Sequence, residues 1–460
     1  MKYIIKTLMG VTIASLLVGC GGSSETPSVV DDQVVGSTEP SVIKYKIIDG
    51  YLGGVDVCVI PPNSSVCNYV GTTDVNGIVA IDSGITGTIV AQVVAGKATD
   101  TDIVGFVPTS YEMMAEISKD TPNVITPFTT IDTLDTTKSM SDIAAELNLS
   151  EDVIASDYIV SADATQSHAH ALARFMASQL ANQIGDNDVA QLYSIMNLGN
   201  NYITEKLLNT ATNLDAIQVH LQYGSVYHTS LMPTLGEYLE QGPLTMLSLS
   251  TPFFAYSGAQ DLVFNNSVVT LSGESSSYSI NGNTLNLGGD GEDKFLYVSD
   301  KFSLSVPVND KDLVLISPID FANGHALFST EHTRLQNELA SLAGQTRYLI
   351  FDDALVSGSK PEPSFVKIDF INKEKAILTE EGEQIEITWS YDSFQFPDLI
   401  FGNILILHMG EHNTSDIRLF ELMSDEHISI MDINRGVTPP QLLFKDEHLA
   451  KAIFEKWTSI

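Results

Sequence analysis

The most specific catalytic pattern in the 460-residue chain is His408-Met409-Gly410-Glu411-His412, which has the H-x-x-E-H spacing of an inverted zinc-peptidase motif. That chemistry needs a helix, because two histidines four residues apart then share one face around zinc with the glutamate beside them. The apolar run 404–407 predicts a strand instead, and Gly410 disfavours a helix. We therefore expect a polar hairpin loop here, with a hydrolase such as a metal peptidase at 408–412 as the alternative.

Two other groups of polar residues could bind a metal. His168 and His170 lie two apart in a predicted helix, so their side chains point about 200° apart, and we expect them on the helix surface. The stretch 288–293 (GGDGED) places carboxylates beside glycines without the spacing of a calcium loop, which favours a solvated turn. The chain has no G-x-S-x-G, P-loop or G-x-G-x-x-G motif. The sequence thus predicts no catalytic residue, no metal ligand and no cofactor.

The N-terminal segment predicts export. Lys2 and Lys6 precede an apolar run at 8–18, which is shorter than the roughly 20 residues that span a bilayer and is typical of a signal peptide. The run ends in Leu17-Val18-Gly19-Cys20, which resembles the lipobox of bacterial lipoproteins. The resemblance implies that residues 1–19 are removed and that Cys20 carries a diacylglycerol and an N-acyl chain such as palmitate. Gly21 follows Cys20, and by the same resemblance this favours sorting to the outer membrane, on its periplasmic face or the cell surface.

Composition limits the partners of the chain. Acidic residues outnumber basic ones 58 to 23, giving a net charge of −35, so nucleic acid and anionic lipid headgroups would be repelled. Expected partners are the membrane, through the lipid anchor, and a protein, a glycan or a small apolar ligand. Cys58 and Cys67 remain after acylation of Cys20, and an even pair in an oxidising compartment predicts a disulfide, with two buried thiols as the alternative.

The secondary-structure elements expected along the sequence predict a multidomain α+β chain. A flexible tether at 20–42 leads to a small β-sandwich at 43–122, where Asn76-Gly77 predicts a type I′ hairpin. Helical periodicity then predicts a helical bundle at 123–245. A β-rich region follows at 246–328, with a hairpin at Asn281-Gly282. Residues 329–460 predict an antiparallel sheet or barrel of seven strands with flanking helices at 330–342 and 446–457.

Three stretches resemble the N-terminal region of Gram-negative surface lipoproteins: Asp49–Val57, Thr73–Gly77 and Val124–Thr130. The resemblance covers about residues 43–245 and implies a prealbumin-like (carboxypeptidase-regulatory-like) sandwich followed by helices. Many relatives have acidic residues of calcium-binding spacing where this chain has Ile60–Ser65, which lacks carboxylates and argues against calcium there.

The C-terminal part resembles the lipocalin-like barrels of bacterial lipoproteins in Leu342–Tyr348, Ile387–Trp389 and Gly402–Ile406. Together these features predict a lipid-anchored outer-membrane or cell-surface lipoprotein that serves as a non-enzymatic binding or structural and adhesion module. The alternative is a lipid-anchored hydrolase that uses the 408–412 stretch.

Overall fold

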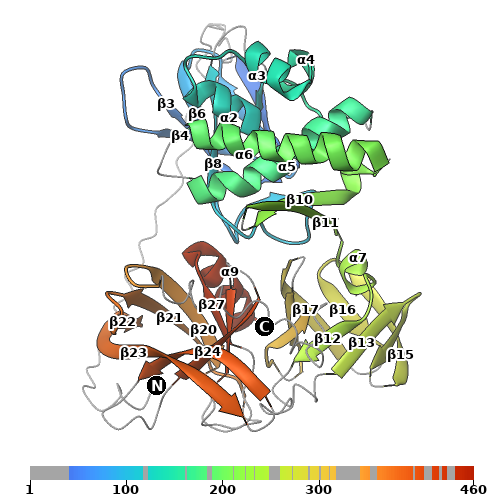
Figure 1. The fold of residues 1–460 in the computed structure, drawn as a ribbon, viewed down its shortest axis with the longest axis vertical. Coiled ribbons are helices and arrows are strands. Elements are labelled where there is room, and N and C mark those ends of the chain that lie inside the picture. The colour runs from blue at the N-terminus through green and yellow to red at the C-terminus, as the bar shows by residue number, and fades with distance from the viewer. Residues whose placement is uncertain are drawn as a thin grey trace, which may run out of the picture.

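The computed structural model has a multidomain α+β fold, in which a sandwich and its helices stand over two barrels (Figure 1). Cys20 and most of the expected tether lie outside the described residues, as do the expected helix at 330–341 and the stretch 409–416. The structure describes residues 41–460 apart from 118–122, 161–162, 184–188, 211, 223, 233, 248–259, 272, 289–290, 300–301, 310, 318–341, 353–359, 397–398, 409–416, 424–426 and 432–440.

Nine strands build the N-terminal sandwich. One sheet has the order β5-β1-β9, the other has the order β4-β3-β6-β8, and β2 pairs with β7 beside them. The strands are β1 (Val42–Ile47), β2 (Leu52–Gly53), β3 (Asp56–Ile60), β4 (Asn68–Thr72), β5 (Ile78–Asp82), β6 (Gly87–Val93), β7 (Thr99–Asp100), β8 (Tyr111–Ile117) and β9 (Val124–Ile125).

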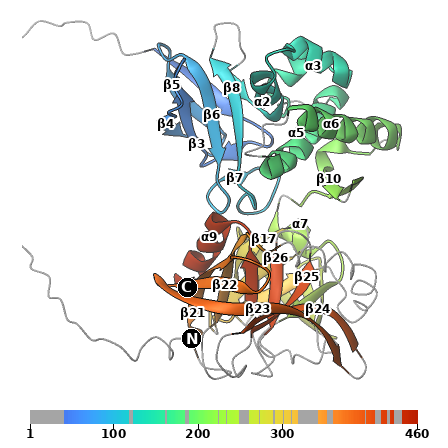
Figure 2. The ribbon, with the colours of Figure 1, turned by 60° about the vertical axis from the view of Figure 1, so that its left-hand side comes forward.

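The two sheets share one apolar core because apolar and polar residues alternate along their strands. Side chains two residues apart point to the same face of a strand, so Val57 and Val59 of β3 face inward together. Across the core they meet Tyr45 and Ile47 of β1, which are at most 2% exposed. The outcome is a small sandwich whose loops at one end point toward the barrels (Figure 2).

The hairpin predicted at Asn76-Gly77 is wrong. A turn forms there, with Gly77 at a φ of +74°, but β4 and β5, which it connects, belong to different sheets. Asp74 determines the turn: its Oδ1 accepts hydrogen bonds from the backbone N–H of Asn76 and Ile78. Because Asn76 does not have a positive φ, the turn is not type I′, and the chain crosses from one sheet to the other.

The two cysteines that the sequence pairs are joined by a disulfide in the structure. Cys58 lies in β3 with 5% of its surface exposed, and Cys67 immediately precedes β4, so the bond closes the loop between two paired strands. That loop, 61–67, is largely exposed and supplies no apolar core of its own.

Replacing both Cys58 and Cys67 with serine should lower the free energy of unfolding by about 2–3 kcal/mol, because the unfolded chain gains the entropy that the closed loop removes. Urea denaturation of the oxidised wild type and of the double variant measures the difference. An unchanged midpoint and slope would show that the disulfide contributes nothing to stability.

Helices cover one face of the sandwich (Figure 2). The described helices are α2 (Pro127–Leu134), α3 (Met140–Leu147), α4 (Glu151–Ile154), α5 (Ala164–Gln183), α6 (Val189–Tyr202), α7 (Leu235–Leu239) and α9 (Glu447–Thr458), with a π-helical turn η1 (Ile203–Leu207) and 3₁₀ turns η2 (Leu208–Thr210) and η3 (Leu214–Ala216). Threonine and serine side chains begin three of them: the hydroxyls of Thr126, Ser139 and Thr234 accept backbone N–H bonds of the first turn.

The long helix α5 joins the helices to the sandwich. Leu172 and Phe175 pack in the helical core with Phe128 of α2, whereas Ala177 and Leu180 reach the sandwich core. A hairpin of β10 (Ile217–Gln222) and β11 (Ser225–Ser230) packs against α5 and α6. The predicted helical bundle did not include this hairpin. Its alternating residues Ile217, Val219 and Leu221 carried the strand signal.

The β-rich region forms a closed eight-stranded barrel. Consecutive strands pair antiparallel, and β19 returns to β12. The strands are β12 (Leu244–Leu247), β13 (Gln260–Asn265), β14 (Val268–Leu271), β15 (Glu274–Asn281), β16 (Thr284–Leu287), β17 (Gly291–Val298), β18 (Ser303–Pro307) and β19 (Val314–Ser317). The hairpin predicted at Asn281-Gly282 is confirmed, because Asn281 pairs with Thr284.

The second barrel is also closed. The sequence predicted seven of its strands, and the eighth, β27, closes the barrel by pairing with β20 and β26. The strands are β20 (Thr346–Asp352), β21 (Pro363–Phe370), β22 (Lys375–Glu380), β23 (Glu383–Phe396), β24 (Leu399–His408), β25 (Ile417–Met423), β26 (His427–Met431) and β27 (Gln441–Phe444). Its described interior side chains, among them Phe370 and Trp389, form one apolar cluster.

The C-terminal helix α9 connects the three parts (Figure 2). Its buried face packs on the outer surface of both barrels, and Trp457 Nε1 donates to the carbonyl of Lys311 at 2.8 Å. At its other end the cap residue Asp446 accepts a 2.7 Å hydrogen bond from Ser110 of the sandwich. The run Leu349-Ile350-Phe351 of β20 is entirely apolar because both faces of this strand are buried. Ile350 faces α9, whereas Leu349 and Phe351 face the barrel interior.

Candidate functional site

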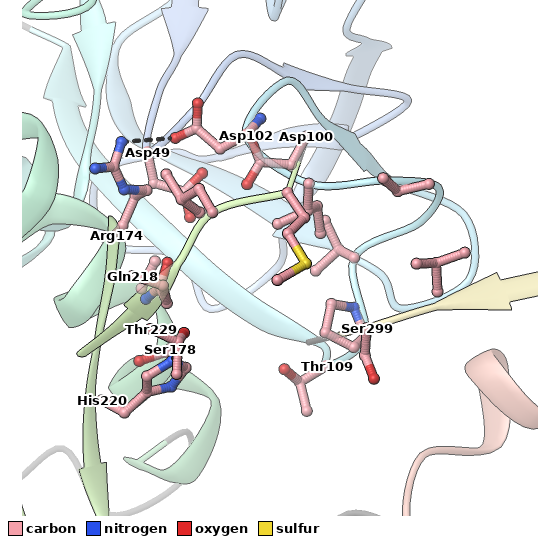
Figure 3. A pocket seen from close by; sticks show the side chains of 18 of the residues that line it. Asp49, Asp100, Asp102, Thr109, Arg174, Ser178, Gln218, His220, Thr229 and Ser299 are labelled. Atoms are coloured by element: carbon pink, nitrogen blue, oxygen red, sulfur yellow. Dashed lines mark hydrogen bonds and ion pairs between the residues drawn. The ribbon is translucent and has the colours of Figure 1, made fainter. Parts of the chain in front are cut away.

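The parts of the chain meet around a cavity of about 210 Å³, which we call the junction pocket (Figure 3). Its wall combines sandwich loops, helix α5, the β10–β11 hairpin, α7 and the turn after β17. The lining residues are Asp49, Asp100, Asp102, Ile103, Val104, Val107, Pro108, Thr109, Tyr111, Arg174, Ala177, Ser178, Gln218, His220, Thr229, Ser230, Leu231, Met232, Tyr238, Val298 and Ser299. The pocket is therefore formed where segments that lie far apart in the sequence pack together.

Three aspartates, Asp49, Asp100 and Asp102, form what we call the acidic end of the pocket (Figure 3). Asp49 follows β1 and is 4% exposed; its carboxylate accepts the Gly50 N–H at 2.9 Å and the Tyr111 hydroxyl at 2.5 Å. Asp100 ends β7, and its Oδ1 accepts the backbone N–H of Asp102 at 2.9 Å.

Glycine is required next to this cluster. A Cβ atom on Gly50 would lie 1.9 Å from Asp100 Oδ1, so any larger residue would displace the carboxylate. The Asp49-Gly50 pair therefore allows the two acidic side chains to approach one another.

One arginine balances part of this charge. Arg174 of α5 is 4% exposed; its Nη1 donates to Asp102 at 3.1 Å, and its Nη2 donates to the carbonyls of Leu214 and Ile217. His170, one turn earlier on α5, places Nε2 2.8 Å from the same Asp102 carboxylate and Nδ1 3.8 Å from Asp215. Helix α5 thus carries both bases that face the acidic end.

The aspartates have divergent pKa values. Burial raises the pKa of Asp49 to about 7 against the opposing hydrogen bond from Tyr111, and burial together with the Asp49 charge raises that of Asp100 well above its usual value. Burial also disfavours ionisation of Asp102, but its contact with His170 and the Arg174 charge outweigh it and lower the pKa. Near neutral pH, Asp102 is therefore ionised and Asp100 keeps its proton, while Asp49 is partly protonated in the absence of a cation.

These shifts predict how stability depends on pH. Because the pKa of Asp49 rises from 3.8 to about 7 on folding, the folded state binds more protons between these values, and stability falls as pH rises through the window. Asp100 acts with the same sign, whereas the lowered pKa of Asp102 stabilises the fold above its unfolded pKa and loses that contribution only at more acidic pH.

We therefore expect Asp49→Asn to flatten the decline in unfolding free energy between about pH 5 and pH 7.5. Urea denaturation of the wild type and of the variant at four pH values across this range measures both slopes. Equal slopes would show that Asp49 titrates normally.

Hydrogen-bonding groups of another kind, from Ser178, Gln218, His220 and Thr229, follow Arg174 along one side of the pocket, which we call the polar wall (Figure 3). His220 Nε2 lies 2.9 Å from Thr229 Oγ1, and its ring stacks on Tyr227 with centroids 5.0 Å apart. Apolar side chains, among them Val104, Val107, Met232 and Val298, complete the lining. The pocket therefore combines a charged end, a wall of hydroxyl, amide and imidazole groups, and apolar side chains.

The predicted site residues lie elsewhere or take another role. The expectation that His168 and His170 lie on the helix surface is wrong: they are 5% and 6% exposed. Their side chains diverge as the helical spacing requires, because His168 Nε2 lies 2.8 Å from Asn200 whereas His170 reaches Asp102. Each of the two rings has a polar partner, which explains how both histidines are buried among the apolar residues of α5.

His408 is the last residue of β24, paired with Thr388, and its Nε2 lies 3.0 Å from Ser390 Oγ. The rest of the 408–412 stretch lies outside the described residues. In the 288–293 stretch, Gly288 lies in a turn directly after β16, and residues 291–293 lie in β17. Among the described residues, no group of three or more histidines, cysteines or carboxylates has the geometry to hold a metal ion.

Sequence reasoning missed the acidic end of the pocket. Asp49-Gly50 entered only as part of a resembling stretch, and Asp100 and Asp102 stand in an ordinary polar loop. Arg174 did carry a signal, because it is the only Lys, Arg, Asp or Glu in the twenty residues of α5 and lies among its apolar positions. A charged residue in that setting is buried only when it is paired.

The fold and the pocket define a multidomain α+β protein with a cavity of mixed polar and apolar lining at the junction of a sandwich, a helical layer and a barrel. Comparison with protein families, with curated proteins and with solved structures finds no match. No helix in the described part of the chain has both the length and the apolar character to cross a membrane.

Proposed function

We propose that the chain is a lipid-anchored outer-membrane lipoprotein that binds a small polar molecule in the junction pocket. The observation that carries the proposal is the lining of the pocket, in which the acidic end adjoins a polar wall of hydroxyl, amide and imidazole groups, with apolar side chains completing the cavity. A concave site with a few convergent polar groups and carboxylates of shifted pKa is typical of a ligand site.

Binding rather than catalysis is favoured by how the polar groups are used. Asp102 is held by Arg174, and Asp49 accepts bonds from Gly50 and Tyr111, so these carboxylates are fixed by the protein itself. Such fixed acceptors suit recognition of a ligand.

A thermal-shift panel tests the binding function. The purified full chain is mixed separately with aliphatic amines, monosaccharides, small carboxylates and nucleosides. A ligand that binds only the folded chain raises its melting temperature, and at a given concentration a tighter ligand raises it more. We expect compounds of at least one class to raise the melting temperature; if none of the four classes does so, the binding proposal is wrong.

The proposed anchor makes a separate prediction. Cys20→Ser removes the sulfur that would carry the diacylglycerol, so the variant would lack the acyl chains whose burial in the bilayer provides stable anchoring. We expect the wild type in the membrane fraction of expressing Gram-negative cells and the variant in the soluble fraction. Cys58→Ser, which leaves Cys20 in place, is the matched control. A variant that stays with the membranes would contradict the lipid anchor.

A further inference from the structure

The acidic end of the junction pocket has more negative than positive groups. Among the described lining residues, Asp49, Asp100 and Asp102 face a single guanidinium, and that group of Arg174 is already engaged by Asp102 at 3.1 Å. His170 contributes a positive charge only when it is protonated, and it also contacts Asp102. A buried carboxylate without a counter-charge is unfavourable, so Asp49 and Asp100 are the groups that a cationic ligand would neutralise.

A second observation comes from Arg174 itself. Although this residue lines the pocket and is 4% exposed, its Nε atom has no hydrogen-bond partner within the described part of the chain. A buried donor left unsatisfied is unfavourable, and an oxygen acceptor on a ligand would satisfy it. A ligand carboxylate would meet three aspartates at this place, so a neutral hydroxyl is the compatible acceptor. The acidic end thus matches an ammonium group with a hydroxyl beside it.

The rest of the pocket matches more hydroxyl groups. Gln218, His220 and Thr229 line the polar wall with an amide, an imidazole and a hydroxyl, all of which pair with neutral hydroxyls. The apolar side chains of the lining suit the C–H face of a ring. The cavity of about 210 Å³ is smaller than the pockets of roughly 300–1,000 Å³ that hold drug-sized ligands, so it has space for a ligand with one ring rather than for several linked rings.

From these features we infer that the junction pocket recognises a single hexose-sized amino sugar with a free amine, its ammonium group bound by Asp49 and Asp100 and its hydroxyls by the polar wall. The inference rests on the proposed binding function and specifies its ligand. Recognition is non-covalent, and discrimination comes from the charge of the amine.

Isothermal titration calorimetry of the purified full chain with four probes tests the inference. Glucosamine has the amine and the hydroxyls, glucose lacks the amine, N-acetylglucosamine has it as a neutral amide, and n-butylamine lacks the hydroxyls. We expect glucosamine to bind at least about tenfold more tightly than each of the other three, a difference of about 1.4 kcal/mol.

Variants locate the binding. Asp49→Asn keeps the shape of the side chain but cannot become negatively charged beside an ammonium group, so it should weaken glucosamine binding about tenfold. Asp82→Asn, which changes an exposed carboxylate at the end of β5, should bind as the wild type does. If circular dichroism shows that Asp49→Asn is unfolded, Asp100→Asn replaces it in the comparison, with the same loss expected.

Three outcomes would overturn the inference. Equal binding of glucose or N-acetylglucosamine would show that the amine is not recognised, and equal binding of n-butylamine would show that the hydroxyls are not. An absence of binding by all four probes would reject the amino sugar. The binding function itself would then still be judged by the thermal-shift panel, which includes carboxylates and nucleosides.

Discussion

Replacing Arg174 with methionine should lower the free energy of unfolding by about 3–5 kcal/mol, because it leaves the buried Asp102 carboxylate without its guanidinium. The same change leaves the carbonyls of Leu214 and Ile217 without the Nη2 donor that satisfies both. Methionine fills a similar volume, so the loss reports on charge and hydrogen bonds rather than on a cavity. Urea denaturation at pH 7 measures it.

Two further variants separate the causes of that loss. In Arg174→Met combined with Asp102→Asn, the uncompensated charge is gone, and we expect about half of the lost stability to return. Arg174→Lys keeps a charge but cannot donate in the planar fork that reaches Asp102 and two carbonyls, so it should remain destabilised. A loss below about 1 kcal/mol in Arg174→Met would show that the ion pair does not hold the acidic end together.

The second large effect is expected at the C-terminal helix. Trp457→Ala should lower the free energy of unfolding by about 3–5 kcal/mol, because the indole is 2% exposed and packs between the two barrels. It should also expose the junction, since α9 is the element that contacts the sandwich, the first barrel and the second barrel. Urea denaturation measures the stability, and limited proteolysis measures the exposure.

Trp457→Phe is the matched control. It keeps an aromatic ring in the apolar cluster but loses the Nε1 donor to the Lys311 carbonyl, so we expect a loss of about 1 kcal/mol and unchanged proteolysis. If the alanine variant is as stable as the phenylalanine variant, α9 does not hold the parts together.

Local sequence patterns were sufficient to predict the helices and strands whose structure depends on residues close together in the sequence. The spacing of Leu172, Phe175 and Met176 predicted α5, and alternation predicted most strands of both barrels. Barrel closure was out of reach, because it depends on the pairing of distant strands such as β12 with β19. The turn at Asn266-Ser267, where both residues have positive φ, also escaped prediction, since serine rarely adopts that conformation.

The pocket could not be predicted for a related reason. Asp49, Asp102 and Arg174 lie far apart in the sequence, and each has an ordinary local pattern when read alone. Their burial and pairing result from packing α5 against the loops of the sandwich. Only the isolated charge of Arg174 in an apolar helix marked a buried ion pair, and nothing in the sequence identified its partner.

The central claim is that the junction pocket is a ligand site, and its most direct test blocks the pocket. Thr109 lines it at the side opposite to Ser178, and Thr109→Trp places an indole in the cavity (Figure 3). Val75→Trp, at a position that is 78% exposed on the sandwich, is the control. The thermal-shift panel is repeated on both variants. We predict that the compounds that stabilise the wild type stabilise Val75→Trp equally and no longer stabilise Thr109→Trp; an undiminished shift in Thr109→Trp would contradict the account.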